Sequence, residues 1–176
     1  MKRVVIIGSG NLAEALARAV AKSGLELVQI FARNAERARI IAELTATDWA
    51  THPGMLAQDA DIYLIAVSDK AVEHVAATLP IPEGAAVAHT AGSVPLAAIP
   101  EKFARRAVFY PMQTFTKGRE VDFSVIPVFL ETPSAELRPE LEAFARQLSG
   151  TVIWATSEQR ARVHLAAVFA CNFANH

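Results

Sequence analysis

Cysteine is almost missing from this chain, whose 176 residues contain one, Cys171. A single cysteine cannot form an internal disulfide, so the default expectation is a cytoplasmic protein in a reducing compartment. Cys171 lies in an apolar helical pattern, where a thiol usually serves packing, and we expect it to be a packing residue rather than a nucleophile.

Strong net charge and long apolar runs are lacking as well. The net charge is −1 with 20% charged residues, which provides no basic surface for nucleic acid. The apolar run near the start of the chain stops at Gly8, too early for a signal peptide or a membrane span. No spacing resembles a metal site, a nucleophile elbow or a pair of glycosidase carboxylates. With 52% hydrophobic residues, the chain is expected to be a compact soluble protein that binds a small molecule, with no nucleic acid, membrane or metal as partner.

Strands and helices alternate along the first half of the sequence. The pattern predicts strands at residues 3–7, 26–31, 61–67 and 85–90 and helices at residues 12–22, 35–44 and 70–79, with a short strand at 47–49 and a helical turn at 55–60. This alternation is typical of an α/β fold of the doubly wound type, a mainly parallel sheet with helices on both faces. Residues 4–7 and 62–67 are apolar throughout, which predicts central strands.

The second half predicts strands at residues 107–110, 125–130 and 151–154 and a helix at 139–148. Thr156 and Gln159 have the spacing of a capping box and should begin a final helix. This helix is apolar nearly all round and continues to Asn175 without a stop signal, so it needs a cover. We therefore expect a dinucleotide-binding domain at residues 1–155 and, at 156–176, the first helix of a helical domain whose remainder is absent and which builds a homodimer.

The most informative stretch is residues 4–16, in which a β-branched run opens into glycine-spaced residues and an alanine-rich helix. Gly8 permits a tight turn, Gly10 lets a pyrophosphate approach the backbone, and Ala13 lets helix and strand pack closely. The N-terminus of the helix offers N–H groups to phosphates. The sequence predicts a dinucleotide-binding turn, the alternative being a tight turn that binds nothing. The expected contacts are Gly8, Ser9, Gly10, Asn11, Leu12 and Ala13.

The end of the second strand indicates which dinucleotide binds. An NAD site usually has an acidic residue there, which repels the extra phosphate of NADP. This chain instead has Arg33, Asn34 as a helix cap, and Arg37 one turn later, a pattern suited to a 2′-phosphate. We therefore expect NADP(H), the alternative being that both arginines belong to a solvated basic helix face.

Small residues follow two further strands and leave room for the ribose and the nicotinamide. Ser68 and the neighbouring Asp69 also fit the role of helix caps, which we slightly favour, and His89 is expected to be a hydrogen-bonded core histidine. The candidate cofactor contacts here are Ala66, Val67, Ser68, Thr90 and Gly92.

Taken together, several segments resemble one known group, the Rossmann-like oxidoreductases that carry a C-terminal domain of unknown function. That group is related to pyrroline-5-carboxylate reductase and to the deazaflavin-dependent NADP oxidoreductases. The resemblance implies an NADP-dependent reductase with the nicotinamide near residues 90–93 and 111–115, and a final segment, 164–176, that begins the second domain. It rests on Gly8-Ser-Gly-Asn-Leu-Ala13, Ala32-Arg33-Asn34, Ile65-Ala66-Val67-Ser68-Asp69, His89-Thr-Ala-Gly-Ser93 and Tyr110-Pro-Met-Gln-Thr-Phe115.

Hydride transfer requires a positioned nicotinamide and a proton donor. His164 is the candidate donor, sharing a helix face with Val168, Cys171 and Asn175, and the alternative is a surface histidine. Gln113, with Thr114, could orient a carbonyl or imine. His52, His74 and His176 belong to no pattern and are expected to be solvated. The predicted function is NADP(H)-dependent transfer of hydride to a small carbonyl, imine or deazaflavin, and the alternative is a non-catalytic NADPH-binding sensor or scaffold.

Overall fold

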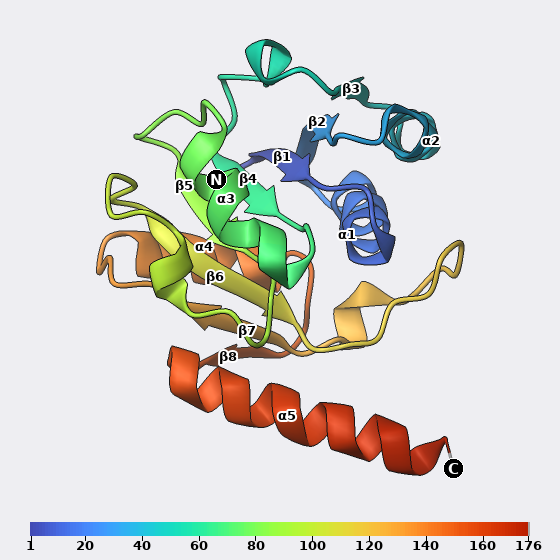
Figure 1. Cartoon of the computed structure of the whole chain (residues 1–176), viewed down its shortest axis with the longest axis vertical. Helices are drawn as coiled ribbons and strands as arrows, with labels where there is room; N and C mark the ends of the chain where they lie inside the picture. Colours follow the sequence, from blue (N-terminus) through green and yellow to red (C-terminus); the bar gives the residue numbers. More distant parts are fainter. Residues whose placement is uncertain (176) are drawn as a thin grey trace.

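The computed structural model describes residues 1–175 and contains one eight-stranded sheet with the order β3-β2-β1-β4-β5-β6-β7-β8 (Figure 1). The strands from β3 to β6 are parallel, β7 is antiparallel to β6, and β8 is parallel to β7. The predicted α/β fold with a mainly parallel sheet is confirmed. The strands are β1 (Arg3–Ile7), β2 (Glu26–Phe31), β3 (Asp48–Ala50), β4 (Ile62–Ile65), β5 (Ala86–His89), β6 (Arg106–Pro111), β7 (Val128–Glu131) and β8 (Val152–Trp154). The helices are α1 (Asn11–Lys22), α2 (Ala35–Thr45), α3 (Val72–Thr78), α4 (Leu137–Arg146) and α5 (Ser157–Ala174).

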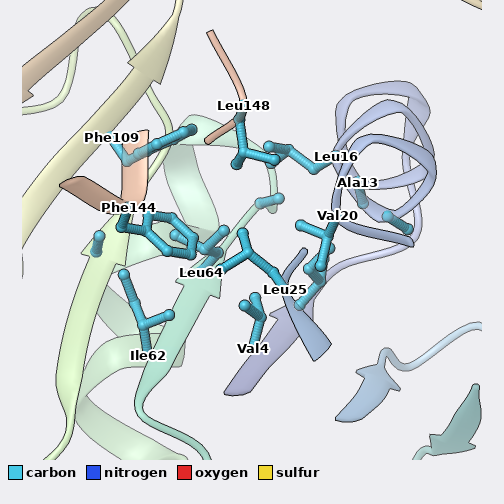
Figure 2. Packing of buried hydrophobic residues seen from close by; sticks show 14 of the residues in the cluster. Val4, Ala13, Leu16, Val20, Leu25, Ile62, Leu64, Phe109, Phe144 and Leu148 are labelled. Atoms are coloured by element: carbon cyan, nitrogen blue, oxygen red, sulfur yellow. The ribbon is translucent and has the colours of Figure 1, made fainter. Parts of the chain in front are cut away.

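Alternate residues of each central strand point to opposite faces of the sheet, as the strand period of two requires. On one face, Val4 and Leu64 pack with Leu16 of α1 and Phe144 of α4 in the largest core (Figure 2). On the other face, the intervening strand residues pack with α3 and with the segment that holds Phe103. Both faces of β1 and β4 are buried, which accounts for their uninterrupted apolar sequences.

A third, smaller cluster joins the sheet to α5. Val108, Tyr110 and Phe129 lie on β6 and β7 and pack against Val163 of α5 and Leu96. Figure 1 shows α5 lying beside β8 and β7, well away from α1 and α2. The helix therefore meets the sheet mainly through its N-terminal half.

Most elements lie within a few residues of their predicted positions, and the differences have local causes. The turn predicted at 55–60 is wrong: a 3-10 helix lies at Pro53–Met55, where the His52 ring accepts from the Gly54 N–H. The helix predicted at 70–79 divides into a 3-10 turn, Asp69–Ala71, and α3. The strand predicted at 125–130 begins at 128, because Asp122 caps a 3-10 turn at Phe123–Val125.

From Leu165 onward, α5 is largely uncovered within the described residues. Leu165, Phe169 and Phe173 are 56%, 55% and 78% exposed, and Cys171 is exposed too. The expectation that Cys171 packs is therefore wrong for residues 1–175, since no described element reaches that face. Among these residues, no helix has the length and apolar character needed to cross a membrane. His176 lies outside the described residues.

Candidate dinucleotide-binding site

The turn between β1 and α1 is built around Gly8, whose φ of +132° lies in a region that side chains rarely adopt. A Cβ placed there would lie 2.7 Å from the carbonyl carbon of Ala66, and nearer still to its oxygen. The Gly8 N–H also donates to the carbonyl of Phe31 at 2.8 Å. Gly8 therefore lets the turn lie directly against the end of β4, at the carboxyl edge of the sheet.

Gly10, two residues later, faces open space. It is the N-cap residue of α1, so no side chain caps the first N–H groups of the helix. A Cβ built on Gly10 would meet nothing within 4 Å. Ser9, Gly10 and Asn11 are partly or fully exposed, whereas Ala13 is buried against the core. An exposed helix N-terminus without a capping side chain has the form of a phosphate cradle, so these residues fit the pyrophosphate of a dinucleotide.

A buried carboxylate lies beneath this turn. Glu14 accepts from Arg37 at 2.9 Å and from Arg18 at 3.1 Å. Burial by itself would raise the pKa of Glu14, but the hydrogen bonds from Arg37 and Arg18 lower it below its ordinary value. Arg37 also donates to the carbonyl of Ser9 at 3.2 Å. This network neutralises Glu14 and ties α2 to the dinucleotide turn.

The end of β2 carries the residues predicted to distinguish NADP from NAD. Arg33 is exposed, and Asn34 caps α2 by accepting from the Arg37 N–H at 3.1 Å, as predicted. The guanidinium of Arg37 is already bonded to Glu14 and Ser9, so it is less available than Arg33 to a ligand. Of the two arginines, Arg33 is the one whose side chain extends freely into solvent.

The loops after β4 and β5 lie beside each other at the same edge. Thr90 is buried, and its hydroxyl donates to the carbonyl of Ile65 at 3.2 Å. Ser93 donates to the carboxylate of Asp69 at 2.7 Å. The expectation of side-chain caps is wrong for Ser68, which makes no cap bond, and the Asp69 carboxylate instead joins the two loops. These loops contain the other candidate cofactor contacts, Ala66, Val67, Ser68 and Gly92, whose contact with a cofactor stays a prediction.

His89 is the last residue of β5 and is fully buried. Its Nδ1 accepts from the Ala91 N–H at 3.2 Å and its Nε2 lies 3.1 Å from the carbonyl of Pro95. Burial is the largest cause that lowers the pKa of His89, to about 4, so the ring is neutral at neutral pH. The prediction of a hydrogen-bonded core histidine is confirmed.

His164 approaches the loop after β5 from α5. Its Nδ1 lies 2.9 Å from the hydroxyl of Tyr110, and the two rings meet edge to face at 5.7 Å. A Cβ on Gly92 would lie 2.5 Å from Nδ1 of His164 and 2.7 Å from Cζ of Tyr110. The histidine is thus fixed against the segment where the nicotinamide is predicted, and it is only half-buried.

Arg160, one turn before His164, fixes the position of α5. Its side chain is 1% exposed and pairs with Glu131 of β7. It also donates to the carbonyls of Ala91, at 3.3 Å, and of Val94. Ser157 completes the cluster by donating to Glu131 at 2.8 Å. Arg160 therefore holds the loop after β5 against the helix.

Sequence reasoning did not select Tyr110, Glu131 or Arg160 as site residues. Arg160 precedes His164 by four positions and so shares its helix face, a signal that was available in the sequence. The partnership with Glu131 links elements that are distant along the chain, and no spacing reveals it.

Gln113, the second predicted catalytic residue, is exposed in the loop after β6. The same loop touches the dinucleotide turn, because the amide of Asn11 donates to the carbonyl of Phe115 at 3.1 Å. The loop that carries Gln113 and Thr114 thus borders the site, while their contact with a substrate stays a prediction. Within residues 1–175, no group of three or more His, Cys, Asp or Glu could hold a metal ion.

The fold and the glycine turn define a dinucleotide-binding α/β protein, and comparison with known proteins identifies its family. Residues 3–91 match the family described as NADP oxidoreductase, coenzyme F420-dependent, and residues 126–176 match a domain of unknown function, DUF2520. The chain belongs to this NADP oxidoreductase family, and NADP as the family's cofactor agrees with the cofactor predicted above. No protein of curated function matches the chain.

Solved structures support the same conclusion. A Bacteroides fragilis protein provisionally assigned as an NADP oxidoreductase is 41% identical, with a TM-score of 0.92 over 99% of this chain and 68% of its own. A Thermotoga maritima protein is 26% identical, with a TM-score of 0.72 over 97% of this chain and 64% of its own. An imine reductase from Myxococcus stipitatus, solved with NADP+, shares the fold at 17% identity, with a TM-score of 0.73 over 98% of this chain and 62% of its own. The chain thus spans about two thirds of the length of these proteins.

Proposed function

We propose that this chain binds NADP(H) and is the cofactor-binding part of a reductase that acts on a small carbonyl, imine or deazaflavin. The observation that carries the proposal is the turn at Gly8 and Gly10. It combines close packing against Ala66 with open space at the N-terminus of α1, which suits a pyrophosphate. Membership of the NADP oxidoreductase family supports the same cofactor.

The predicted contacts follow the carboxyl edge of the sheet. Residues 8–13 would hold the pyrophosphate, and Arg33 would pair with the 2′-phosphate that distinguishes NADP from NAD. Asn34 and Arg37 support this end by capping and anchoring α2. The loops that contain residues 66–68 and 90–92 would flank the ribose and the nicotinamide. When bound, NADPH would supply the hydride.

His164 would supply the proton that accompanies reduction. It lies against Gly92, is half-buried, and extends from an element outside the nucleotide turn. In its cationic form it would donate a proton to the oxygen or nitrogen of the substrate and would recover it from water. Gln113 would orient the substrate from the loop after β6.

We further propose that residues 1–155 form the cofactor domain and that residues 156–176 begin a helical domain. The exposed apolar face of α5 supports an interface, either with more of such a domain or with a second copy in a homodimer. The proposed location is the cytoplasm, where NADPH is available and a free cysteine stays reduced.

A second candidate function is a non-catalytic NADPH sensor. It is favoured by the exposure of Gln113, which leaves His164 as the partly buried one of the two predicted catalytic residues. NADPH oxidation with a panel of imines, keto acids and deazaflavins distinguishes the two functions. Turnover that is lost in His164→Asn supports the reductase, whereas tight binding with no turnover across the panel supports the sensor.

Isothermal titration with NADPH and NADH tests the cofactor. We expect NADPH to bind more tightly, and Arg33→Ala to weaken NADPH by about tenfold or more while leaving NADH unchanged, because a charge-assisted hydrogen bond contributes about 1.5–3 kcal/mol. Arg39→Ala is the matched control, since Arg39 is an exposed arginine of α2 that pairs with Glu43. Equal affinity for both nucleotides, or no binding of either, would refute the proposal.

A further inference from the structure

Tyr110 and His164 form a hydrogen-bonded pair that bridges the sheet and α5. Tyr110 lies near the end of β6, and its ring packs on Phe129 at 6.0 Å. The backbone of Gly92 lies so close to both side chains that there is no room for a Cβ. Arg160 secures the same turn of α5 to the loop. The imidazole therefore has little freedom to rotate away.

We propose that Tyr110 is a positioning residue, which fixes the His164 ring and keeps a proton on its Nε2, the nitrogen turned away from the tyrosine. This inference rests on the proposed function, in which His164 faces the substrate. Within residues 1–175, Nδ1 has the Tyr110 hydroxyl as its partner and no hydrogen bond reaches Nε2. A substrate carbonyl or imine would thus meet a ring whose free nitrogen bears a hydrogen.

The arrangement works in both charge states of the histidine. When the ring is neutral, the Tyr110 hydroxyl donates to Nδ1, because Nδ1 is its one hydrogen-bond partner within residues 1–175 and the alternative tautomer would leave the phenol hydrogen without a protein acceptor. The single ring proton then stays on Nε2. When the ring is cationic, the hydroxyl oxygen accepts from the Nδ1–H, and Nε2 again carries a proton. A phenol can exchange these roles by rotating its O–H bond, which a backbone carbonyl at the same place could not do.

The surroundings keep the phenol in its protonated form. Burial, followed by the negative charge of Asp69, raises the pKa of Tyr110 above its ordinary value. The charged groups around the pair are already partnered, because Arg160 pairs with Glu131 and Asp69 accepts from Ser93. The Tyr110 hydroxyl is therefore available to Nδ1 of His164.

Nitrogen-15 NMR of protein labelled at histidine measures the tautomer directly, without a substrate. The His164 signals are assigned by their loss in His164→Asn, and the spectra are recorded near pH 8, where histidine is normally neutral. In the wild type we expect the Nε2–H tautomer. In Tyr110→Phe we expect the ratio of Nε2–H to Nδ1–H to fall by about fivefold, the effect of losing one neutral hydrogen bond.

Tyr63→Phe is the matched control. Tyr63 is the other tyrosine of the chain; it is fully buried and donates to the carbonyl of Ala57 at 2.6 Å on another part of the sheet. This variant loses a buried hydroxyl too, and it should leave the His164 signals and turnover unchanged. Tyr110→Phe should lower kcat about tenfold or more for any substrate found, with the dissociation constant for NADPH unchanged.

Two results would overturn the inference: the Nδ1–H tautomer at His164 in the wild type, or an unchanged tautomer ratio in Tyr110→Phe. A wild-type protein that binds no NADPH would instead overturn the proposed function, while the NMR spectra would still decide the tautomer. The two failures are therefore distinguishable.

Discussion

The two glycines of the dinucleotide turn should respond to the same substitution in opposite ways. In Gly8→Ala the new Cβ would lie 2.7 Å from the carbonyl carbon of Ala66, in a backbone with φ +132°. Adverse backbone geometry costs about 1–3 kcal/mol, and overpacking costs about 1–3 kcal/mol more. We expect the free energy of unfolding to fall by roughly 2–6 kcal/mol, and the Tm by roughly 10 °C, at about 2–4 °C per kcal/mol for a chain of this size.

Gly10→Ala should leave stability nearly unchanged, because φ is −78° and the Cβ would meet nothing within 4 Å. Its methyl group would instead occupy the space proposed for the pyrophosphate, so the dissociation constant for NADPH should rise at least about tenfold, or about 1.4 kcal/mol. Urea unfolding followed by circular dichroism measures stability, and isothermal titration measures binding. Wild-type stability in Gly8→Ala, or wild-type NADPH affinity in Gly10→Ala, would refute the reasoning.

Three further changes test other parts of the structure. Burial lowers the pKa of His89 from 6.5 to about 4 in the folded protein, so between these pH values the unfolded chain binds a proton that the folded chain does not. The free energy of unfolding should therefore fall by about 2 kcal/mol between pH 7 and pH 5. Urea unfolding of His89→Gln at several pH values should lack this part of the pH dependence. Arg160→Ala leaves Glu131 partly buried without its cation, which should cost about 3–5 kcal/mol in urea unfolding; a loss no larger than that of the exposed-site variant Arg162→Ala would contradict the role assigned to Arg160. Replacing Leu165 and Phe169 by serine removes two exposed apolar side chains of α5. Burying each of them in an interface would contribute about 1.5–3 kcal/mol, so the double variant should weaken any self-association more than tenfold. Analytical ultracentrifugation measures the association, and Arg162→Ala is the control.

Much of the fold could be predicted because local patterns determine it. Residues 4–7 and 62–65 are apolar on both faces and form the central strands β1 and β4, and the capping box at Thr156 and Gln159 begins α5 as expected. The start of the helix predicted at 70–79 was placed less accurately, because its first turn closes as a 3-10 turn. Local sequence therefore predicted the elements better than their ends.

The glycine turn could be recognised because its conformation and its neighbours are encoded within a few residues. The anchoring of α5 could not, since Arg160 meets Glu131, Ala91 and Val94 across long sequence separations. His164 was selected from its helix face, but its partner Tyr110 depends on how α5 lies on β6 and β7. Contacts of this kind follow from tertiary packing, which a single sequence does not specify.

The separation of the nucleotide turn from the helix that bears His164 has a consequence for diversification. Because α5 meets the sheet through its first turns, residues farther along it can vary without disturbing the packing around Gly8 or the arginine beyond β2. A lineage built on this scaffold could change its substrate while keeping one coenzyme. Grafting the α5 sequence of a relative, with Ser157, Arg160 and His164 retained, would reveal whether specificity can be transferred in that way.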